Sequence, residues 1–419
     1  MPVTDPAAFL RALFDAALSA AGPEGNFGAL PPEPEGRLVV IGAGKGSARM
    51  AAAFEAEVEK AGWTTKPEGL IVTRYGHACP TRHVEVVEAS HPVPDAAGEV
   101  AARRILHLAE GAGEKDLVVA LISGGASALL ALPVSPATLA DKQQVGRALL
   151  KSGAPIDEMN RVRQALSGIK GGRLAAAAAP ARLVTWMISD VPGDEPAVIG
   201  SGPTVALPDG ESPEAILERR GVQIGDALRG VIADNPAPKE VSGELRMLAT
   251  PQMALEAAAE AARAAGVTPM ILGDAIEGEA REAAQVMAGI TRQVLRHGQP
   301  LPRPCVLLSG GETTVTVRGQ GGRGGRNAEF LLALAVALGA DMAGVHALAA
   351  DTDGIDGSED NAGAIIGPDT HARAGEAGVS LRALLDGNDA YSAFEALGDL
   401  VVTGPTLTNV NDFRAIYLP

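Results

Sequence analysis

Short apolar runs that end in glycine or serine recur through the first half of this 419-residue chain, and they constrain its fold more than any other feature. They centre on Val39, Val72, Val119 and Val184. Runs this short and continuous are typical of strands buried on both faces of a parallel sheet. Helical patterns occupy the segments between them, at residues 47–62, 95–112 and 136–150. The alternation predicts a doubly wound α/β domain, in which ligands bind beyond the carboxyl ends of the strands.

The second half predicts another α/β domain, with a mixed sheet. Helical patterns near residues 251–266 and 277–297 alternate there with apolar runs. Strands are expected near residues 268–273, 305–310, 313–318, 346–351, 362–366, 399–404 and 415–418. Prolines, a glycine and scattered charges mark residues 230–244, so we place the boundary there, between domains 1–240 and 241–419.

Composition excludes several classes of protein. Hydrophobic residues make up 46% of the chain and charged residues 21%, as in compact globular proteins and not in disordered ones. The net charge of −16 opposes binding to nucleic acid or to an anionic membrane. The two cysteines, Cys79 and Cys305, support neither a disulfide framework nor a thiolate metal site. We therefore expect a cytoplasmic protein, and whether it forms a homodimer stays open.

The first residues predict an amphipathic helix and not a signal peptide. Asp5, Arg11 and Asp15 interrupt the apolar core that a signal peptide requires. The apolar face of the expected helix comprises Phe9, Leu10, Leu13, Phe14, Ala17 and Leu18. No apolar run in the sequence reaches membrane-spanning length.

The most glycine-rich segment, residues 309–330, predicts an anion-binding site. Seven glycines surround Glu312 and the arginines Arg318, Arg323 and Arg326. Glycine lets backbone N–H groups approach an oxyanion, and arginine forks match carboxylate or phosphate oxygens. The alternative is a flexible linker, but linkers lack arginine and do not lead directly into an apolar helix. Gly310, Gly311 and Glu312 are therefore candidates to contact phosphate.

A turn at the end of the strand around Val39 is a second candidate for phosphate binding. Gly44 and Lys45 occupy it, and Lys45 places a compact positive charge at the carboxyl end of a strand. The turn is not a dinucleotide fingerprint, because Ser47 stands where the third glycine is needed, and it is not a Walker A loop. The alternative is that Lys45 is simply solvated.

The strand around Val119 ends in a similar turn, formed by Ser123, Gly124 and Gly125. A helix is expected to begin directly after it, so its amides are suited to an anion. A nucleophilic serine is a weaker alternative, because no G-x-S-x-G motif surrounds Ser123.

Carboxylates and basic residues complete the candidate site. Asp190 follows the strand around Val184, and Asp351 and Asp353 follow another, positions from which a carboxylate can bind Mg²⁺ or accept a hydroxyl proton. The Asp351 loop does not fit an EF-hand. Arg163 and Lys170 belong to a basic segment that also contains Arg161 and Arg173, and it is suited to the carboxylate of a small acid. The alternatives are ordinary turn residues and a solvated helix face.

Seven blocks, taken in order, resemble the MOFRL-type (class II) glycerate 2-kinases. They are GAGKGSARMA, SGGASALL, LSGIKGGRLA, SDVPGDEPAVIGSGPT, SGGETTVTVRGQGGRGGRNAEFLLALA, DTDGIDG and TGPTLTNVND. The resemblance implies ATP-dependent phosphorylation of glycerate to 2-phosphoglycerate. It also implies a Rossmann-like N-terminal domain, a smaller C-terminal α/β domain and an active site in the cleft between them. The chain departs from the family at Leu407, where glycine is common, and this concerns the local turn.

The resemblance also implies that Lys45 and Arg326 are leading active-site residues, with Mg²⁺ as the metal. Our hypothesis is that they flank the transferred phosphoryl group, while Asp190 or a carboxylate of the Asp351 loop holds Mg²⁺ or accepts the hydroxyl proton. Arg163, Lys170 or Arg323 would bind the carboxylate of glycerate. Members of the family have also been called hydroxypyruvate reductases. That NAD(P)-dependent activity and a non-enzymatic anion-binding function are the alternatives.

Overall fold

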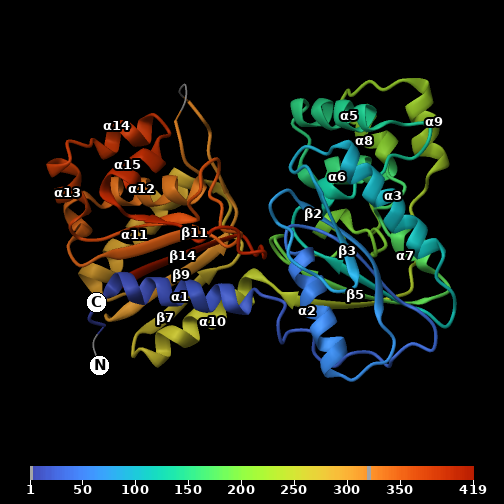
Figure 1. Cartoon of the computed structure of the whole chain (residues 1–419). Coiled ribbons are helices and arrows are strands. Elements are labelled where there is room, and N and C mark those ends of the chain that lie inside the picture. Colours follow the sequence, from blue (N-terminus) through green and yellow to red (C-terminus); the bar gives the residue numbers. More distant parts are fainter. Residues whose placement is uncertain (1–2, 319–321) are drawn as a thin grey trace. The chain divides into compact units, whose positions relative to one another are not determined.

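The computed structural model of this protein describes residues 3–318 and 322–419. The chain forms two compact units, each with its own sheet and core (Figure 1). The N-terminal unit comprises Pro23–Leu248, and the C-terminal unit comprises Met1–Gly22 together with Ala249–Pro419. The expected two-domain α/β class is confirmed.

The N-terminal unit is built on a six-stranded sheet with the order β3-β2-β1-β4-β5-β6. Its strands are β1 (Leu38–Ala43), β2 (Pro67–Arg74), β3 (Val84–Ala89), β4 (Leu117–Ile122), β5 (Arg182–Ile188) and β6 (Glu244–Ala249). β1 pairs in parallel with β2 and β4, and β3 and β5 extend the parallel sheet. This is the order of a Rossmann-type sheet, whose direction of growth reverses between β1 and β4.

Helices cover both faces of this sheet. On one face, Phe54 of α2 (Ser47–Lys60) packs with Phe27 and Trp186, at ring-centroid distances of 5.5–5.6 Å. On the other, α3 (Ala96–Glu110) and α7 (Arg173–Ala178) share a core with β1, β2 and β4. A separate small core joins helices α5 (Leu139–Lys151), α6 (Ile156–Ala165), α8 (Pro213–Arg219) and α9 (Asp226–Asp234).

The C-terminal unit contains a six-stranded mixed sheet with the order β13-β12-β11-β14-β9-β7. Its strands are β7 (Thr268–Gly273), β9 (Cys305–Gly311), β11 (His346–Asp351), β12 (Gly363–Ile366), β13 (Leu400–Val401) and β14 (Asp412–Leu418). β7 and β9 are parallel, whereas β14 is antiparallel to both β9 and β11. A two-stranded sheet pairs β8 (Gly278–Glu279) with β10 (Thr313–Thr314). The predicted mixed sheet is confirmed.

Two sets of helices cover this second sheet. On one face α1 (Pro6–Ala20) lies beside α10 (Pro251–Ala264), as Figure 1 shows. On the other, α11 (Ala280–His297) packs against α12 (Arg326–Leu338). Three short helices extend that second layer: α13 (Thr370–Glu376), α14 (Leu381–Asp386) and α15 (Ala390–Leu397).

The division of the chain differs from the predicted boundary at both ends. The predicted amphipathic helix, α1, belongs to the C-terminal unit, because its apolar face packs on β14: Phe9 lies 5.0 Å from Tyr417 and Phe14 lies 5.6 Å from Phe413, between ring centroids. At the other end, residues 241–248 belong to the N-terminal unit, because β6 completes its sheet. The predicted domains 1–240 and 241–419 are therefore corrected to residues 23–248 for the N-terminal unit, and to residues 1–22 with 249–419 for the C-terminal unit.

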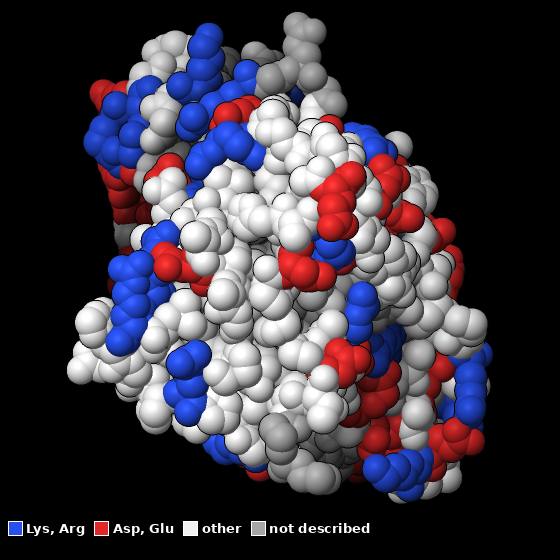
Figure 2. Space-filling model, turned by 90° about the vertical axis from the view of Figure 1, so that its left-hand side faces the viewer, with Lys and Arg blue, Asp and Glu red and all other residues white. Residues whose placement is uncertain are grey.

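Figure 2 shows a face on which Lys and Arg lie among Asp and Glu, with a broad uncharged area between them. No helix in residues 3–318 and 322–419 is long and apolar enough to cross a membrane.

Candidate active site

The turns that follow β1 and β4 interlock at the point where the sheet changes its direction of growth. The Lys45 backbone N–H donates to the Gly124 carbonyl at 2.8 Å, and the Gly46 N–H donates to Ser123 Oγ at 3.0 Å. These bonds fix the two predicted phosphate-binding turns against each other. Ligands of doubly wound sheets bind at such a switch point.

Two glycines of these turns are required by the close approach. Gly44 has a φ of +138°, and a Cβ there would overlap the Ser123 side chain and carbonyl. Gly125 has a φ of +82°, and a Cβ there would lie 3.2 Å from the His91 ring and 3.3 Å from Lys45 Cγ. The structure thus brings Gly44, Lys45, Ser123, Gly124 and Gly125 together. Their contact with phosphate stays a prediction.

Asp190 reaches the same edge of the sheet from β5. It is two residues beyond the end of β5, which runs parallel to β4 and pairs Met187 with Ile122. In the described residues, no three His, Cys, Asp or Glu side chains form a group that could hold a metal ion.

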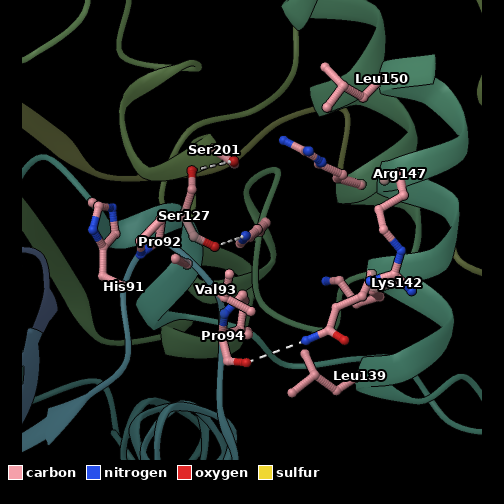
Figure 3. A pocket seen from close by; sticks show the side chains of 17 residues that line it. His91, Pro92, Val93, Pro94, Ser127, Leu139, Lys142, Arg147, Leu150 and Ser201 are labelled. Atoms are coloured by element: carbon pink, nitrogen blue, oxygen red, sulfur yellow. Dashed lines mark hydrogen bonds between the residues drawn. The ribbon is translucent and has the colours of Figure 1, made fainter. Parts of the chain in front are cut away.

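A pocket of about 460 Å³ opens beside these turns, within the N-terminal unit. One wall is the segment from His91 to Pro94, and the opposite wall is α5, with Leu139, Lys142, Arg147 and Leu150 (Figure 3). Gln143 of α5 donates to the Pro94 carbonyl at 3.4 Å and links the two walls. Ser127 and Ser201 lie between them, with their hydroxyl oxygens 2.7 Å apart.

Two of the predicted substrate-binding residues, Arg163 and Lys170, line this pocket. Lys170 is only 4% exposed, and its Nζ donates to the Ser127 carbonyl. Burial, with Arg163 as a second cause, lowers the pKa of Lys170 to about 7. Burial also lowers the pKa of Arg163. An anion bound in the pocket would raise both pKa values, since a negative charge stabilises the protonated forms.

The other two arginines of that basic segment have structural partners elsewhere. Arg161 donates to the Pro208 carbonyl at 3.0 Å. Arg173 donates to both the Asn235 side chain and the Asn235 carbonyl, and also to the Lys170 carbonyl. Burial lowers the pKa of Arg173 to about 10. Arg163 and Lys170 thus line one pocket, whereas Arg161 and Arg173 line a second one, of about 580 Å³, in the same unit.

Arg326 begins α12 in the C-terminal unit and contacts three carboxylates. Its Nε donates to Asp412 at 2.7 Å, and its two terminal nitrogens donate to Glu312 at 2.6 Å and to Asp351 at 2.8 Å. Burial opposes the charge, but Asp412, Asp351 and Glu312 outweigh it and raise the pKa of Arg326. The guanidinium is therefore held in one orientation at the start of a helix.

Buried acids hold the start of α12 in place. Asp356 accepts the backbone N–H groups of Asn327 and Ala328, at 2.9 and 2.8 Å. Burial raises the pKa of Asp356 to about 6, although these two donors oppose the shift. Asp412 is 2% exposed and accepts from Arg414 as well as from Arg326. This arrangement orders the helix that carries Arg326.

The predicted metal ligands Asp351 and Asp353 lie beside this cluster. Asp351 Oδ1 accepts the Asp353 N–H at 2.9 Å, and Asp353 Oδ1 accepts the Ile355 N–H at 2.9 Å. Both residues are buried, with exposed fractions of 5% and 2%. Their role as Mg²⁺ ligands stays a prediction.

Three glycines of the 309–330 segment, Gly310, Gly311 and Gly325, have packing roles. Gly310 and Gly311 pair with Phe413 and Asp412 in the sheet, and a Cβ on Gly311 would overlap the Ile276 backbone. Likewise, a Cβ on Gly325 would overlap the Asp356 backbone. Close backbone approach explains these glycines without a bound phosphate. Part of the segment, residues 319–321, lies outside the described residues.

Arg323, the third predicted substrate-binding residue, contacts side chains of α15. Its guanidinium donates to Glu395 at 2.7 Å and to Ser392 at 3.1 Å, and it lies 4.6 Å from the centre of the Tyr391 ring. Arg323 belongs to the C-terminal unit, whereas the pocket that contains Arg163 and Lys170 is lined by residues of the N-terminal unit alone.

Comparisons with known proteins agree with the motifs. The MOFRL family model matches residues 305–412, and a model described as a domain of unknown function, DUF4147, matches residues 9–233. A D-glycerate 2-kinase of Thermotoga maritima is 39% identical over 382 residues, covering 90% of this chain and 89% of the relative. The chain belongs to the MOFRL-type glycerate kinase family.

A solved structure supports the same family, whereas two relatives from Agrobacterium vitis have a different name. The crystal structure of a glycerate kinase from T. maritima matches this glycerate kinase family member with a TM-score of 0.89 and 36% identity, over 99% of each chain. A protein of Agrobacterium vitis is 55% identical over 98% of this chain and 94% of its own length, and its provisional name is hydroxypyruvate reductase. The two names describe different reactions.

The departure of this glycerate kinase family member at Leu407 has a structural cost. Leu407 has a φ of +60°, a left-handed conformation that costs a residue with a Cβ roughly 1–2 kcal/mol. We expect Leu407→Gly to raise the free energy of unfolding by about 1 kcal/mol, because the side chain is only partly buried. Urea unfolding measures this change.

Leu407→Ala is the matched control, because alanine retains the Cβ that causes the strain. It should give no gain in the free energy of unfolding. Equal stabilisation by alanine and glycine would show that the left-handed backbone is not the cause.

Sequence reasoning missed one residue of the candidate site, Lys142, which lines the pocket from α5. Asp412 of the TGPTLTNVND block was a candidate from the sequence, as a polar group that orients a ligand or as an ordinary turn residue. In the structure it fixes the Arg326 guanidinium. Lys142 had no signal in the sequence, since a lysine on an amphipathic helix is usually on its solvated face.

Proposed function

We propose that this protein phosphorylates D-glycerate to 2-phosphoglycerate with ATP and Mg²⁺. Membership of the glycerate kinase family supports the reaction class. The observation that carries the proposal is the interlocked pair of turns at the switch point of the Rossmann-type sheet, which places Lys45 beside a pocket containing Arg163 and Lys170. That arrangement supplies cations for both a phosphoryl group and a carboxylate.

Phosphoryl transfer depends mainly on positioning and on neutralising the charge of the phosphoryl oxygens. In this proposal Lys45 and Arg326 act on the transferred phosphoryl group, in the interdomain site that the family resemblance implies. The amides of the Gly44 and Ser123–Gly125 turns contact phosphate oxygens. Arg163 and Lys170 bind the carboxylate of glycerate, which orients its 2-hydroxyl group.

A carboxylate is also needed to accept the hydroxyl proton or to bind Mg²⁺. Asp190 is the candidate on the N-terminal unit, since it reaches the same sheet edge as Lys45. Asp351 and Asp353 are the candidates on the C-terminal unit, where Asp351 also contacts Arg326. When bound, Mg²⁺ would neutralise phosphate charge, and these carboxylates would be its protein ligands.

A hydroxypyruvate reductase is the second candidate, because the A. vitis relative has that provisional name. The first turn does not favour a dinucleotide. Ser47 takes the place of the third glycine, and its hydroxyl is buried and donates to the Leu121 carbonyl at 3.1 Å. A third glycine in that position normally allows the helix to pack closely on the strand.

One assay separates these functions. The purified protein is incubated with D-glycerate and Mg-ATP, ADP is followed by a coupled assay, and the phosphoglycerate isomer is identified by phosphorus NMR. We expect ADP in proportion to 2-phosphoglycerate. In parallel, hydroxypyruvate is offered with NADH or NADPH, and we expect no cofactor oxidation.

Cofactor oxidation without ADP formation would replace the kinase with the reductase. Ligand binding without either reaction would indicate a non-enzymatic anion-binding protein. The described structure pairs neither Cys79 nor Cys305 in a disulfide, which is compatible with the proposed cytoplasmic location.

A further inference from the structure

The pocket between the His91–Pro94 segment and α5 contains more positive charge than one carboxylate needs. Four basic side chains line it: Lys142, Arg147, Arg163 and Lys170. Among its lining residues, all of which the structure describes, there is no aspartate or glutamate. The chain as a whole has a net charge of −16, so this concentration of cations is local. Glycerate has a single negative charge at neutral pH, which leaves most of these cations without a counter-charge.

Lys142 is the member of this group whose position is hardest to explain without a ligand. Its Nζ is buried and has no hydrogen-bond partner among the described residues. A lysine near a surface normally extends its amine into water along its flexible stem. Burying the amine without a partner costs free energy. Lys142 lies on α5, across the pocket from His91 and Pro92 (Figure 3).

The electrostatics around Lys142 support a missing anion. Burial, followed by the positive charges of Lys170, Arg173 and Arg163, holds the pKa of Lys142 well below its usual range. The Glu99 carboxylate of α3 opposes these effects, but it already pairs with Arg103 at 3.0 Å. Arg147 and His91 also line the pocket. An anion bound near Lys142 would raise its pKa and draw a proton from solution.

We propose that this pocket binds a phosphorylated small acid, an anion with both a carboxylate and a phosphate, and that Lys142 is the residue that distinguishes it from the unphosphorylated acid. A phosphate group adds between one and two negative charges at neutral pH, about what the additional cations can neutralise. The inference rests on the proposed function, because the kinase reaction forms such an acid. The reaction product would then bind more tightly than glycerate and inhibit the enzyme.

Calorimetric titration of the full-length protein tests the assignment, with no turnover required. The ligands are 2-phosphoglycerate, D-glycerate, ADP and inorganic phosphate, and the proteins are the wild type, Lys142→Gln and Lys151→Gln. Lys151 is the matched control, because it is an exposed lysine on the same helix outside the pocket. We expect Lys142→Gln to weaken 2-phosphoglycerate binding roughly tenfold or more and D-glycerate binding at most slightly. Lys151→Gln should match the wild type.

A second measurement uses the wild type alone, so it does not depend on the fold of a variant. Titration of 2-phosphoglycerate in buffers with different ionisation enthalpies reports the protons that are taken up on binding. We expect proton uptake near pH 8 with 2-phosphoglycerate. Thermal melting checks the variant, and Lys142→Gln should be at least as stable as the wild type because it removes a buried charge without a partner.

Three outcomes would overturn the proposal. One is equal weakening of 2-phosphoglycerate and D-glycerate by Lys142→Gln. Another is 2-phosphoglycerate binding without proton uptake in the wild type. The third is loss of ADP binding alone in Lys142→Gln, which would assign the pocket to the nucleotide. Failure of the kinase function is distinguishable from all three, because it appears as absent ADP formation in the assay with Mg-ATP.

Discussion

Arg326→Ala is expected to lower kcat by on the order of a thousandfold, as loss of other arginines that stabilise a transferred phosphoryl group does. In the structure its guanidinium contacts Asp412, Asp351 and Glu312. Asp412 and Asp351 are buried and fix its orientation, whereas the Glu312 side chain is 48% exposed. A phosphoryl group can therefore replace Glu312 without displacing the buried partners. Steady-state kinetics with D-glycerate and Mg-ATP measure the change.

The alanine variant also loses stability, so the rate must refer to folded protein. Removing one partner of a buried ion pair costs about 3–5 kcal/mol, although Arg414 still contacts Asp412. Arg326→Lys keeps the charge but loses the planar fork, and it should also be slow. The control is Arg373→Ala. Arg373 lies on α13 and pairs with Asp369 and Asp399, and its loss should leave kcat unchanged. Full activity in a folded Arg326→Ala protein would remove Arg326 from the reaction.

Lys45→Met is expected to lower kcat by on the order of a hundredfold to a thousandfold, the usual cost of removing one donor that stabilises transition-state charge. The backbone N–H of Lys45 bonds to the Gly124 carbonyl and its stem lies near Gly125, and both of these contacts can be kept when the amine is replaced. Methionine keeps an unbranched apolar stem of similar length. The KM for D-glycerate should change much less than kcat, because Arg163 and Lys170 are proposed to bind the acid.

Lys60→Met provides the matched control for this lysine. It lies in the last turn of α2, its side chain is 76% exposed, and the same charge is removed. Kinetics of both variants should be accompanied by melting curves. If Lys45→Met raised KM for the acid and left kcat intact, Lys45 would be a substrate-binding residue and not a partner of the phosphoryl group.

The sheet of the N-terminal unit was predictable where burial was complete. β1 and β4 are buried along their full length, and their short continuous apolar runs are typical of such buried strands. The outer strands β3 and β6 were not predicted. β3 contains Glu85 and Glu88, and β6 begins with the exposed Glu244 and Leu245, so neither is a continuous apolar run. At the edge of a sheet, pairing and not burial decides the structure.

The expected strand at residues 313–318 was correct only at its beginning. Its alternation of threonine and valine is typical of a half-buried strand, but only Thr313 and Thr314 pair, with β8. Thr316 instead bonds to the Glu279 side chain, and Val317 is 65% exposed. Alternation predicts an extended backbone, but it does not predict whether another strand pairs with that backbone.

The candidate site was predictable where residues follow strands and unpredictable where helices contribute. The Lys45, Ser123 and Asp190 turns come together because parallel neighbouring strands end at one edge. Lys142 lies on a helix whose partner across the pocket, the His91–Pro94 segment, is distant in sequence. Likewise, the partner of Arg326, Asp412, is 86 positions away along the chain. Sequence spacing cannot predict such pairs.

The position of α1 determines the order in which the protein can fold as it is synthesised. The helix is synthesised before the N-terminal unit, yet Phe9 and Phe14 pack against Tyr417 and Phe413 of β14, which is synthesised after that unit. The contiguous N-terminal unit can fold while the rest of the chain is still being made, since domains generally fold as units. The apolar face of α1 is covered by β14 only after that strand has been synthesised. A chain truncated before β14 would keep that face exposed, as a mark of incomplete synthesis that chaperones and proteases recognise.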